Sequence, residues 1–137
     1  MAVLSFISMY ILIYAMVDRF GNLFNNLNQL YMAGLMTAPM IIIELLLMKD
    51  MYENKRLNAP LLAVSAIALI LLFTFIRQQT AISDRQFLRS MIPHHASAIL
   101  MCEQAPVRDP KIEELCKSII ASQQSEIAQM KLLLQGP

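Results

Sequence analysis

The sequence is poor in charge, glycine and cysteine, and it has no tryptophan. Only 15% of its 137 residues are charged, whereas 57% are hydrophobic. A disordered tail and an ordinary soluble domain both need more polar surface, so the composition excludes these two classes. The net charge is +1 and there is no run of basic residues, which argues against binding to nucleic acid. Two cysteines are too few for a disulfide framework.

Abundant leucine, isoleucine, methionine and alanine predict an all-α protein. Three apolar stretches in residues 1–76 are expected to be transmembrane helices, at about 2–17, 31–48 and 59–76. The first is short for a span, and its alternative is a signal peptide, although no basic residue precedes it and no cleavage site follows. Residues 77–137 carry seven basic and six acidic groups, so we expect a water-exposed helical hairpin there.

The expected orientation in the membrane follows from a short basic loop at residues 49–58. This loop contains Lys49, Lys55 and Arg56, and the positive-inside rule places it in the cytoplasm. The protein is then an integral protein of a bacterial inner (plasma) membrane, in contact with lipid, with its hairpin on the periplasmic or extracellular face. Four basic residues near the span ends oppose this orientation, so charge alone leaves it open: Arg19, Arg77, Arg85 and Arg89.

The second expected span carries a row of methionines that recur every four residues. On a helix this spacing forms one slowly drifting row, made of Met32, Met36, Met40, Glu44 and Met48. A row of thioethers with a carboxylate suits a path for a soft metal ion. The alternative is that methionine packs well between helices and that Glu44 pairs with the nearby Lys49.

Sequence signals at the helix ends divide the tail into two helices. A capping box at Ser83 predicts a first helix that runs to about Gln104, kinked or interrupted at Pro93. The dipeptide Asp109-Pro110 predicts the start of a second helix, which runs to about Leu134. Two helices of this length cannot bury both of their apolar faces alone, so a second copy of the chain or another membrane subunit is expected to cover them.

Polar and soft side chains lie on the inward faces of both helices. Gln123 and Glu126 fall within the apolar stripe of the second helix, which indicates a ligand or a buried hydrogen-bond network. Imidazole and thioether groups are donors that suit Cu(I), and the inward faces carry Met91, His94, His95, Met101 and Met130. The alternative is that the two histidines hydrogen-bond across the hairpin to Gln123 and Glu126 and bind no metal.

The same residues resemble a known family. The pattern M-x-x-H-H at 91–95, a methionine at 101 and Q-x-x-E-I-x-x-M at 123–130 is similar to the signature of the CopM-type family. That family is catalogued as a domain of unknown function, and its characterised members bind copper in the periplasm. The resemblance implies a ferritin-like helical bundle, of which this hairpin is one half. It also implies that the five methionines and histidines of the inward faces are copper ligands.

The expected turn near Pro106 limits which side chains can meet. With a tight turn there, Met91 lies level with Gln123, whereas Met130 lies level with Ser83. We therefore expect one copper site at Met91, His94 and His95, supported by Gln123 or Glu126 from the facing helix. Met101 and Met130 are then separate or inter-chain ligands. The same alignment places Cys102 opposite Lys111 and predicts no disulfide between Cys102 and Cys116, because the axial gap is roughly 7 Å.

The sequence thus predicts a membrane-anchored protein that holds, buffers or passes copper, with Cu(I) favoured. No nucleophile–base arrangement or cofactor motif indicates an enzyme. The alternative is an accessory or structural subunit of a larger membrane complex, in which the hairpin is a docking element.

Overall fold

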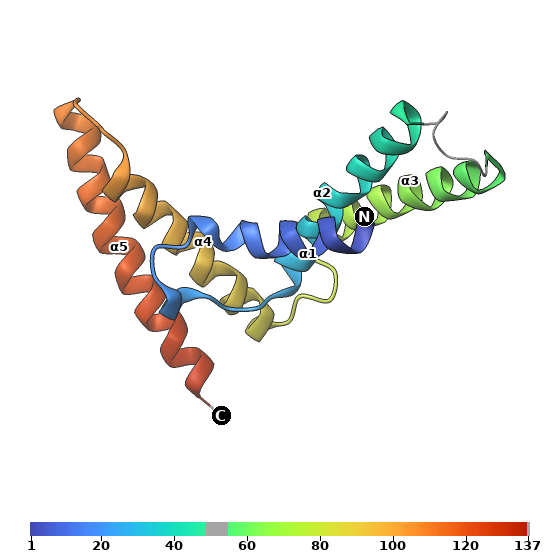
Figure 1. The fold of residues 1–137 in the computed structure, drawn as a ribbon. Helices are drawn as coiled ribbons and strands as arrows, with labels where there is room; N and C mark the ends of the chain where they lie inside the picture. The colour runs from blue at the N-terminus through green and yellow to red at the C-terminus, as the bar shows by residue number, and fades with distance from the viewer. Residues whose placement is uncertain (49–54, 137) are drawn as a thin grey trace. The chain divides into compact units, whose positions relative to one another are not determined.

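The computed structural model describes residues 1–48 and 55–136, and every regular element in these two ranges is a helix (Figure 1). This confirms the all-α prediction. The elements in chain order are α1 (Ala2–Leu12), the 3-10 turns η1 (Ile13–Met16) and η2 (Phe20–Asn22), α2 (Leu27–Leu47), α3 (Lys55–Gln78), α4 (Asp84–Gln104) and α5 (Pro110–Gln135).

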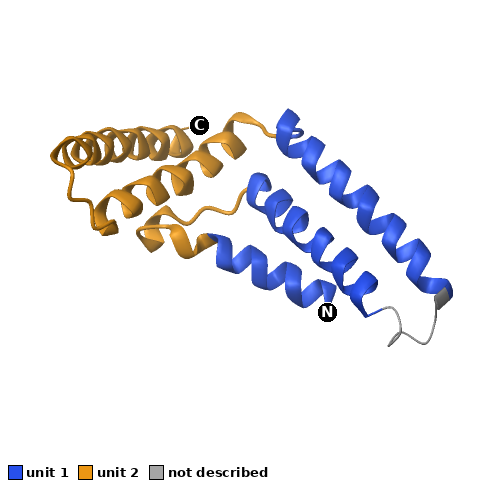
Figure 2. Cartoon of the chain, turned by 90° about the horizontal axis from the view of Figure 1, so that it is seen from above, with its two compact units in different colours: residues 1–13, 27–81 blue, residues 14–26, 82–137 orange. Residues whose placement is uncertain are grey.

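The chain divides into two compact units (Figure 2). Unit 1 combines residues 1–13 with 27–81, and unit 2 combines residues 14–26 with 82–137. The sequence predicts a division at residue 76, whereas unit 1 extends to residue 81 and leaves out residues 14–26. The segment 14–26, which lies between α1 and α2 in the sequence, belongs with the hairpin rather than with unit 1.

Unit 1 holds the apolar helices. α2 and residues 56–78 of α3 are long and apolar enough to cross a membrane. The apolar helix at Ala2–Met16 is shorter. Its α-helical part, with 11 residues, rises about 16 Å, whereas the hydrocarbon core of a bilayer is about 30 Å thick. Length and composition therefore favour two spanning helices where the sequence predicts three.

α2 and α3 pack antiparallel. The Nδ2 of Asn28 donates to Oε1 of Gln79 at 2.9 Å, and the hydroxyl of Tyr31 donates to the carbonyl of Thr80 at 3.1 Å. A Cβ added at Gly34 would lie 2.7 Å from Cδ1 of Leu72, so glycine permits the two helices to approach closely there. The start of α2 and the end of α3 therefore lie at the same end of this pair.

The basic loop that sets the expected orientation is largely outside the described residues. Lys49 lies in the range 49–54, and nothing is described for the side chain of Lys55. Arg56, in the first turn of α3, is the basic residue of this loop that the structure describes.

Unit 2 is built on the α4–α5 hairpin, whose helix ends agree with the sequence prediction. α4 begins after Ser83, although the Ser83 side chain makes no capping hydrogen bond, and the helix continues through Pro93 without a break. α5 begins at Pro110, and the Asp109 carboxylate accepts a hydrogen bond from the backbone N–H of Lys111 at 2.8 Å.

The core of unit 2 lies between α4, α5 and the segment 14–26. Its buried residues are Ile92, Ala96, Ile99, Ile127 and Met130. Val17 and Phe24 of the segment pack against this cluster, together with Leu88, Met91, Ile120 and Leu134 of the hairpin. The sequence leads us to expect that another chain covers the apolar faces of the hairpin. Residues 14–26 of the same chain supply part of this cover.

Candidate metal site in the hairpin

Pro93 leaves one backbone carbonyl in the middle of α4 without a hydrogen-bond donor. Because proline has no N–H, the carbonyl four residues earlier, that of Arg89, loses its hydrogen-bond partner within the helix. The structure supplies a substitute, since Nδ2 of Asn26 lies 3.4 Å from this carbonyl oxygen. Asn26 is only 5% exposed, so the segment 14–26 inserts a buried amide at the point where the helix lacks a donor.

A second contact ties the same segment to α5. Nζ of Lys131 donates to Oδ1 of Asn22 at 2.6 Å, and Nδ2 of Asn22 donates to Oδ1 of Asp18 at 2.7 Å. Asn22 is also buried. Asn26 and Asn22 of this segment therefore hold it against both helices of the hairpin.

Replacing Asn26 by alanine should destabilise unit 2 by about 1–3 kcal/mol, because the partly buried carbonyl of Arg89 would lose its donor. The measurement is equilibrium unfolding of the full chain in detergent. Asn25→Ala is the matched control, since Asn25 is exposed and its change should cost less than about 0.5 kcal/mol. Equal effects of the two variants would contradict the role given to Asn26.

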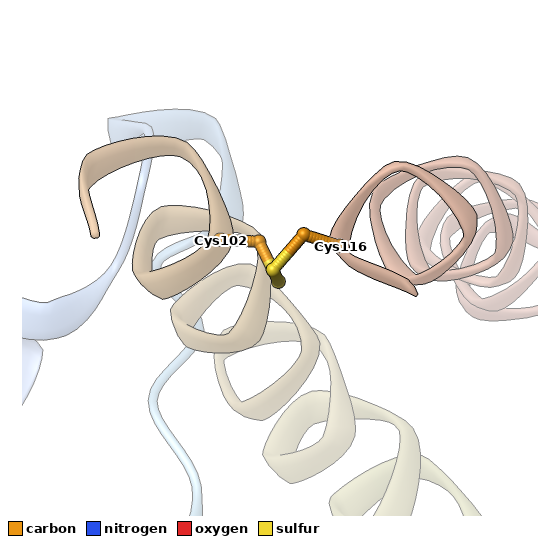
Figure 3. The surroundings of a disulfide bond; sticks show 2 residues. All are labelled: Cys102 and Cys116. Carbon is orange, nitrogen blue, oxygen red and sulfur yellow. A yellow bond between two sulfur atoms is a disulfide. The ribbon is translucent and has the colours of Figure 1, made fainter. Parts of the chain in front are cut away.

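The two cysteines form a disulfide between α4 and α5 (Figure 3). The Cα atoms of Cys102 and Cys116 are 5.2 Å apart, so the sequence prediction that they do not bond is wrong. That prediction assumed a tight turn at Pro106. Instead the backbone is extended at Ala105 and at Asp109, and the loop continues past the end of α4 before α5 begins (Figure 1).

This extended loop shifts the alignment of the two helices. Cys102 lies opposite Cys116 rather than opposite Lys111, a shift of five residues. The same shift corrects the expected position of Met130, which does not lie level with Ser83. All pairings across the hairpin that depend on the tight turn change with it.

His95 and Glu126 are paired across the hairpin. Nε2 of His95 lies 2.7 Å from Oε2 of Glu126. Met91 precedes His95 by one helical turn and Met130 follows Glu126 by one turn, so in antiparallel helices Met91 and Met130 are level with each other. Met91 packs against the buried cluster that contains Met130, in agreement with this alignment. The imidazole of His95 and the thioethers of Met91 and Met130 therefore lie within about one helical turn of each other along the hairpin.

The hydrogen bond to Glu126 decides which ring nitrogen of His95 carries a proton and which can bind a metal ion. A carboxylate can only accept, so Nε2 of His95 carries the proton that it donates to Glu126. In the neutral imidazole, Nδ1 is then the nitrogen with a free lone pair, and this atom is buried without a hydrogen-bond partner in the described part of the chain. Histidines that bind metals usually donate their other ring N–H to a carboxylate or carbonyl. The residues present therefore fit a metal ion at Nδ1.

Glu126 is kept ionised beside His95. The hydroxyl of Ser122 donates to its Oε1 at 2.8 Å. This hydrogen bond, followed by that of His95, lowers the pKa of the Glu126 carboxyl, and burial opposes them only in part. Gln123, the other residue expected to support the site, does not bond to either histidine, and its Oε1 is buried without a partner among the described residues.

Two of the predicted ligands lie apart from this site. His94 is exposed, with its ring centroid 6.1 Å from that of His95. Met101 is 52% exposed and lies about 9 Å farther along α4 than His95. Within residues 1–48 and 55–136, no three His, Cys, Asp or Glu side chains gather as a metal cluster. The candidate donor set therefore consists of Nδ1 of His95 and the thioethers of Met91 and Met130.

Comparison with known proteins places these residues in a family. Residues 73–134 match DUF305, described as a domain of unknown function. The chain is also 36% identical over 119 residues to a protein of Acanthamoeba polyphaga mimivirus described as "Uncharacterized protein L153", covering 85% of this chain and 76% of the viral protein. A match of that length extends beyond the hairpin into the apolar helices. No solved structure matches the chain. The chain therefore belongs to the family of this viral protein, and its residues 73–134 match the DUF305 domain.

Proposed function

We propose that this protein is anchored in a membrane by α2 and α3 and binds Cu(I) in its hairpin. The observation that carries the proposal is the buried Nδ1 of His95, which has no hydrogen-bond partner while Glu126 holds Nε2. The thioethers of Met91 and Met130 lie level with each other, one turn away. Imidazole and thioether together are soft donors, which favour Cu(I) over harder cations.

The disulfide supports this choice of ligands. Because Cys102 and Cys116 are bonded to each other, neither offers a thiolate to a metal ion. The remaining soft donors of the hairpin are thioethers and imidazoles. A protein with this donor set suits holding, buffering or passing copper on, since none of these groups is arranged as a nucleophile with a base.

The disulfide also supports a location for the hairpin. Disulfides persist in oxidising compartments such as the periplasm or the extracellular space. We place unit 2 on that side of the membrane. α2 then crosses the membrane from this side and α3 returns to it, so that the loop with Lys49 lies in the cytoplasm, as the positive-inside rule requires.

The test is competition titration of the purified full chain with Cu(I), in detergent and with ascorbate as reductant. Met91→Leu and Met130→Leu should each weaken binding at the hairpin by about tenfold, because each removes a soft ligand at nearly constant volume. Met101→Leu is the matched control and should leave the affinity unchanged. A wild-type protein that binds no Cu(I), or an equal loss in the Met101 variant, would contradict the proposal.

A second candidate function is docking of another subunit or a second copy of the chain on α5. Large apolar side chains on this helix favour it, since Leu115, Leu132 and Leu133 are 57%, 68% and 67% exposed. Light scattering of the detergent-solubilised protein, with Leu132→Ser/Leu133→Ser for comparison, distinguishes the two roles. An oligomer that the double substitution dissociates, in a protein that binds no copper, would favour docking.

A further inference from the structure

The methionine row of α2 is neither buried in the packing of unit 1 nor fully exposed. Met32, Met36 and Met40 are 40%, 43% and 39% exposed, whereas Leu47 on the same helix is 79% exposed. Met48, which continues the helical hydrogen bonding to the carbonyl of Glu44, is 37% exposed. Met32, Met36 and Met40 thus form an accessible line along α2, and Met48 lies beyond Glu44, just past the end of the helix.

Packing alone does not account for where these methionines lie. α3 is longer than α2 and its spanning stretch is more hydrophobic, it packs against α2, and it contains no methionine over its 24 residues. The large apolar residues of α3 are instead leucine, isoleucine, valine and phenylalanine. If methionine served only as an adaptable apolar residue, α3 would have the same use for it. Between α2 and α3, thioethers occur on α2 alone and in one row, which indicates a chemical role.

The spacing lets neighbouring thioethers share one ion. Side chains four residues apart on a helix lie on the same face, with about 5–6 Å between their Cβ atoms. Met32 with Met36, and Met36 with Met40, are such pairs. The long, unbranched methionine side chain allows both sulfur atoms of a pair to approach an ion between them, and thioethers select Cu(I) over Mg²⁺, Ca²⁺ or Na⁺. Because the pairs overlap at Met36, an ion can move by one turn while exchanging one sulfur ligand.

The row continues into a carboxylate. Glu44 follows Met40 by one turn and precedes Met48 by one turn. An ionisable residue within a spanning helix is costly and usually marks an ion pathway. A monovalent cation in a low-dielectric environment also requires compensation of its charge, which Glu44 provides on the same row.

We propose that the row Met32–Met36–Met40–Glu44–Met48 is a second Cu(I)-binding element, which passes the ion along α2. The inference rests on the proposed function for the origin of the ion. The chain enters α2 directly from unit 2, and it returns to unit 2 from the end of α3 that Tyr31 contacts. Met32 therefore lies at the end of the α2–α3 pair where the chain connects to the copper-binding hairpin.

The test uses Ag(I), a redox-stable probe for Cu(I), and the full chain. Met36→Leu/Met40→Leu removes the centre of the row while keeping volume and helix propensity. Met91→Leu/Met130→Leu removes the hairpin thioethers, and Met9→Leu/Met16→Leu is the control for methionines outside both elements. Ag(I) stoichiometry is measured in detergent, and Ag(I) entry is measured in liposomes of neutral phospholipid that contain each protein.

The wild type and the control should bind Ag(I) at the hairpin and also at the row. The row variant should lose only the ions bound at the row and keep those bound at the hairpin. Its Ag(I) entry should be at least about tenfold slower than that of the wild type. The hairpin variant should keep the additional ions, which separates a failure of the proposed function from a failure of this inference. Equal stoichiometry in the row variant and the wild type would overturn the site. The path would be overturned if Ag(I) enters liposomes with the wild-type protein no faster than it enters protein-free liposomes. It would also be overturned if the row variant lets Ag(I) enter as fast as the wild type does.

Discussion

Replacing His95 by alanine should weaken Cu(I) binding at the hairpin by about tenfold to a hundredfold or more. The loss of an outer partner of a ligand alone typically costs about 10–100-fold, and this change removes the ligand itself. Glu126→Gln should give a smaller loss, because glutamine still accepts from Nε2 of His95 but lacks the negative charge. Competition titration of the full chain with Cu(I) measures both effects.

His94→Ala is the control for this prediction, since it removes the neighbouring imidazole from the exposed side of the same helix. Its affinity should stay within about twofold of the wild type, which is less than about 0.5 kcal/mol. A loss in the His94 variant as large as that in the His95 variant would contradict the assignment of the site to the hairpin interior.

Removing the disulfide should cost the hairpin a large part of its stability. The cysteines are 14 residues apart, and closing a loop of this size stabilises a protein by about 3 kcal/mol through the loss of entropy in the unfolded chain. The variant Cys102→Ser/Cys116→Ser should therefore have a free energy of unfolding lower by about 2–4 kcal/mol.

Chemical reduction of the wild type is the matched comparison, because it opens the same bond without a substitution. The reduced protein and the double variant should unfold at the same denaturant concentration. The intact mass of the non-reduced monomer should be two hydrogens lower than the mass calculated for free thiols. A mass equal to that of the dithiol form would contradict the disulfide and with it the alignment of α4 and α5.

Local sequence signals predicted most of the helix boundaries in the tail. The Asp109-Pro110 start, the first helix up to Gln104 and the end of α5 near Leu134 all depend on capping and proline effects within a few residues. The two long apolar runs likewise predicted the two long apolar helices, because a helix able to span a membrane is defined by its own length and composition.

What the sequence could not predict depends on contacts between distant residues. Nothing local in the segment 14–26 indicates that Asn26 satisfies the carbonyl that Pro93 leaves free. The sequence did contain one usable signal. A proline inside a helix requires a donor from elsewhere for the carbonyl four residues earlier, and four nearby asparagines can supply one.

The alignment of the hairpin decided how much of the site was predicted. The pairing of Glu126 with the histidine face was expected, and the structure places it on His95. The predicted position of Met130 is wrong, because residues 105–109 form an extended loop instead of a tight turn, and extended residues advance the chain by about 3.3 Å each rather than 1.5 Å. Had the cysteines been taken as a pair, the correct alignment would have followed from them.

The coordination of copper in the hairpin is tested most directly by X-ray absorption at the copper edge. The sample is the Met36→Leu/Met40→Leu variant loaded with Cu(I) to the capacity of the hairpin, so that the row on α2 does not contribute. Because both cysteines are in the disulfide, sulfur around the metal can come only from methionine. We predict a shell with both sulfur and nitrogen neighbours, which loses nitrogen in the His95→Ala variant. A shell of oxygen and nitrogen alone would contradict the assignment of Met91 and Met130 with His95 as the copper site.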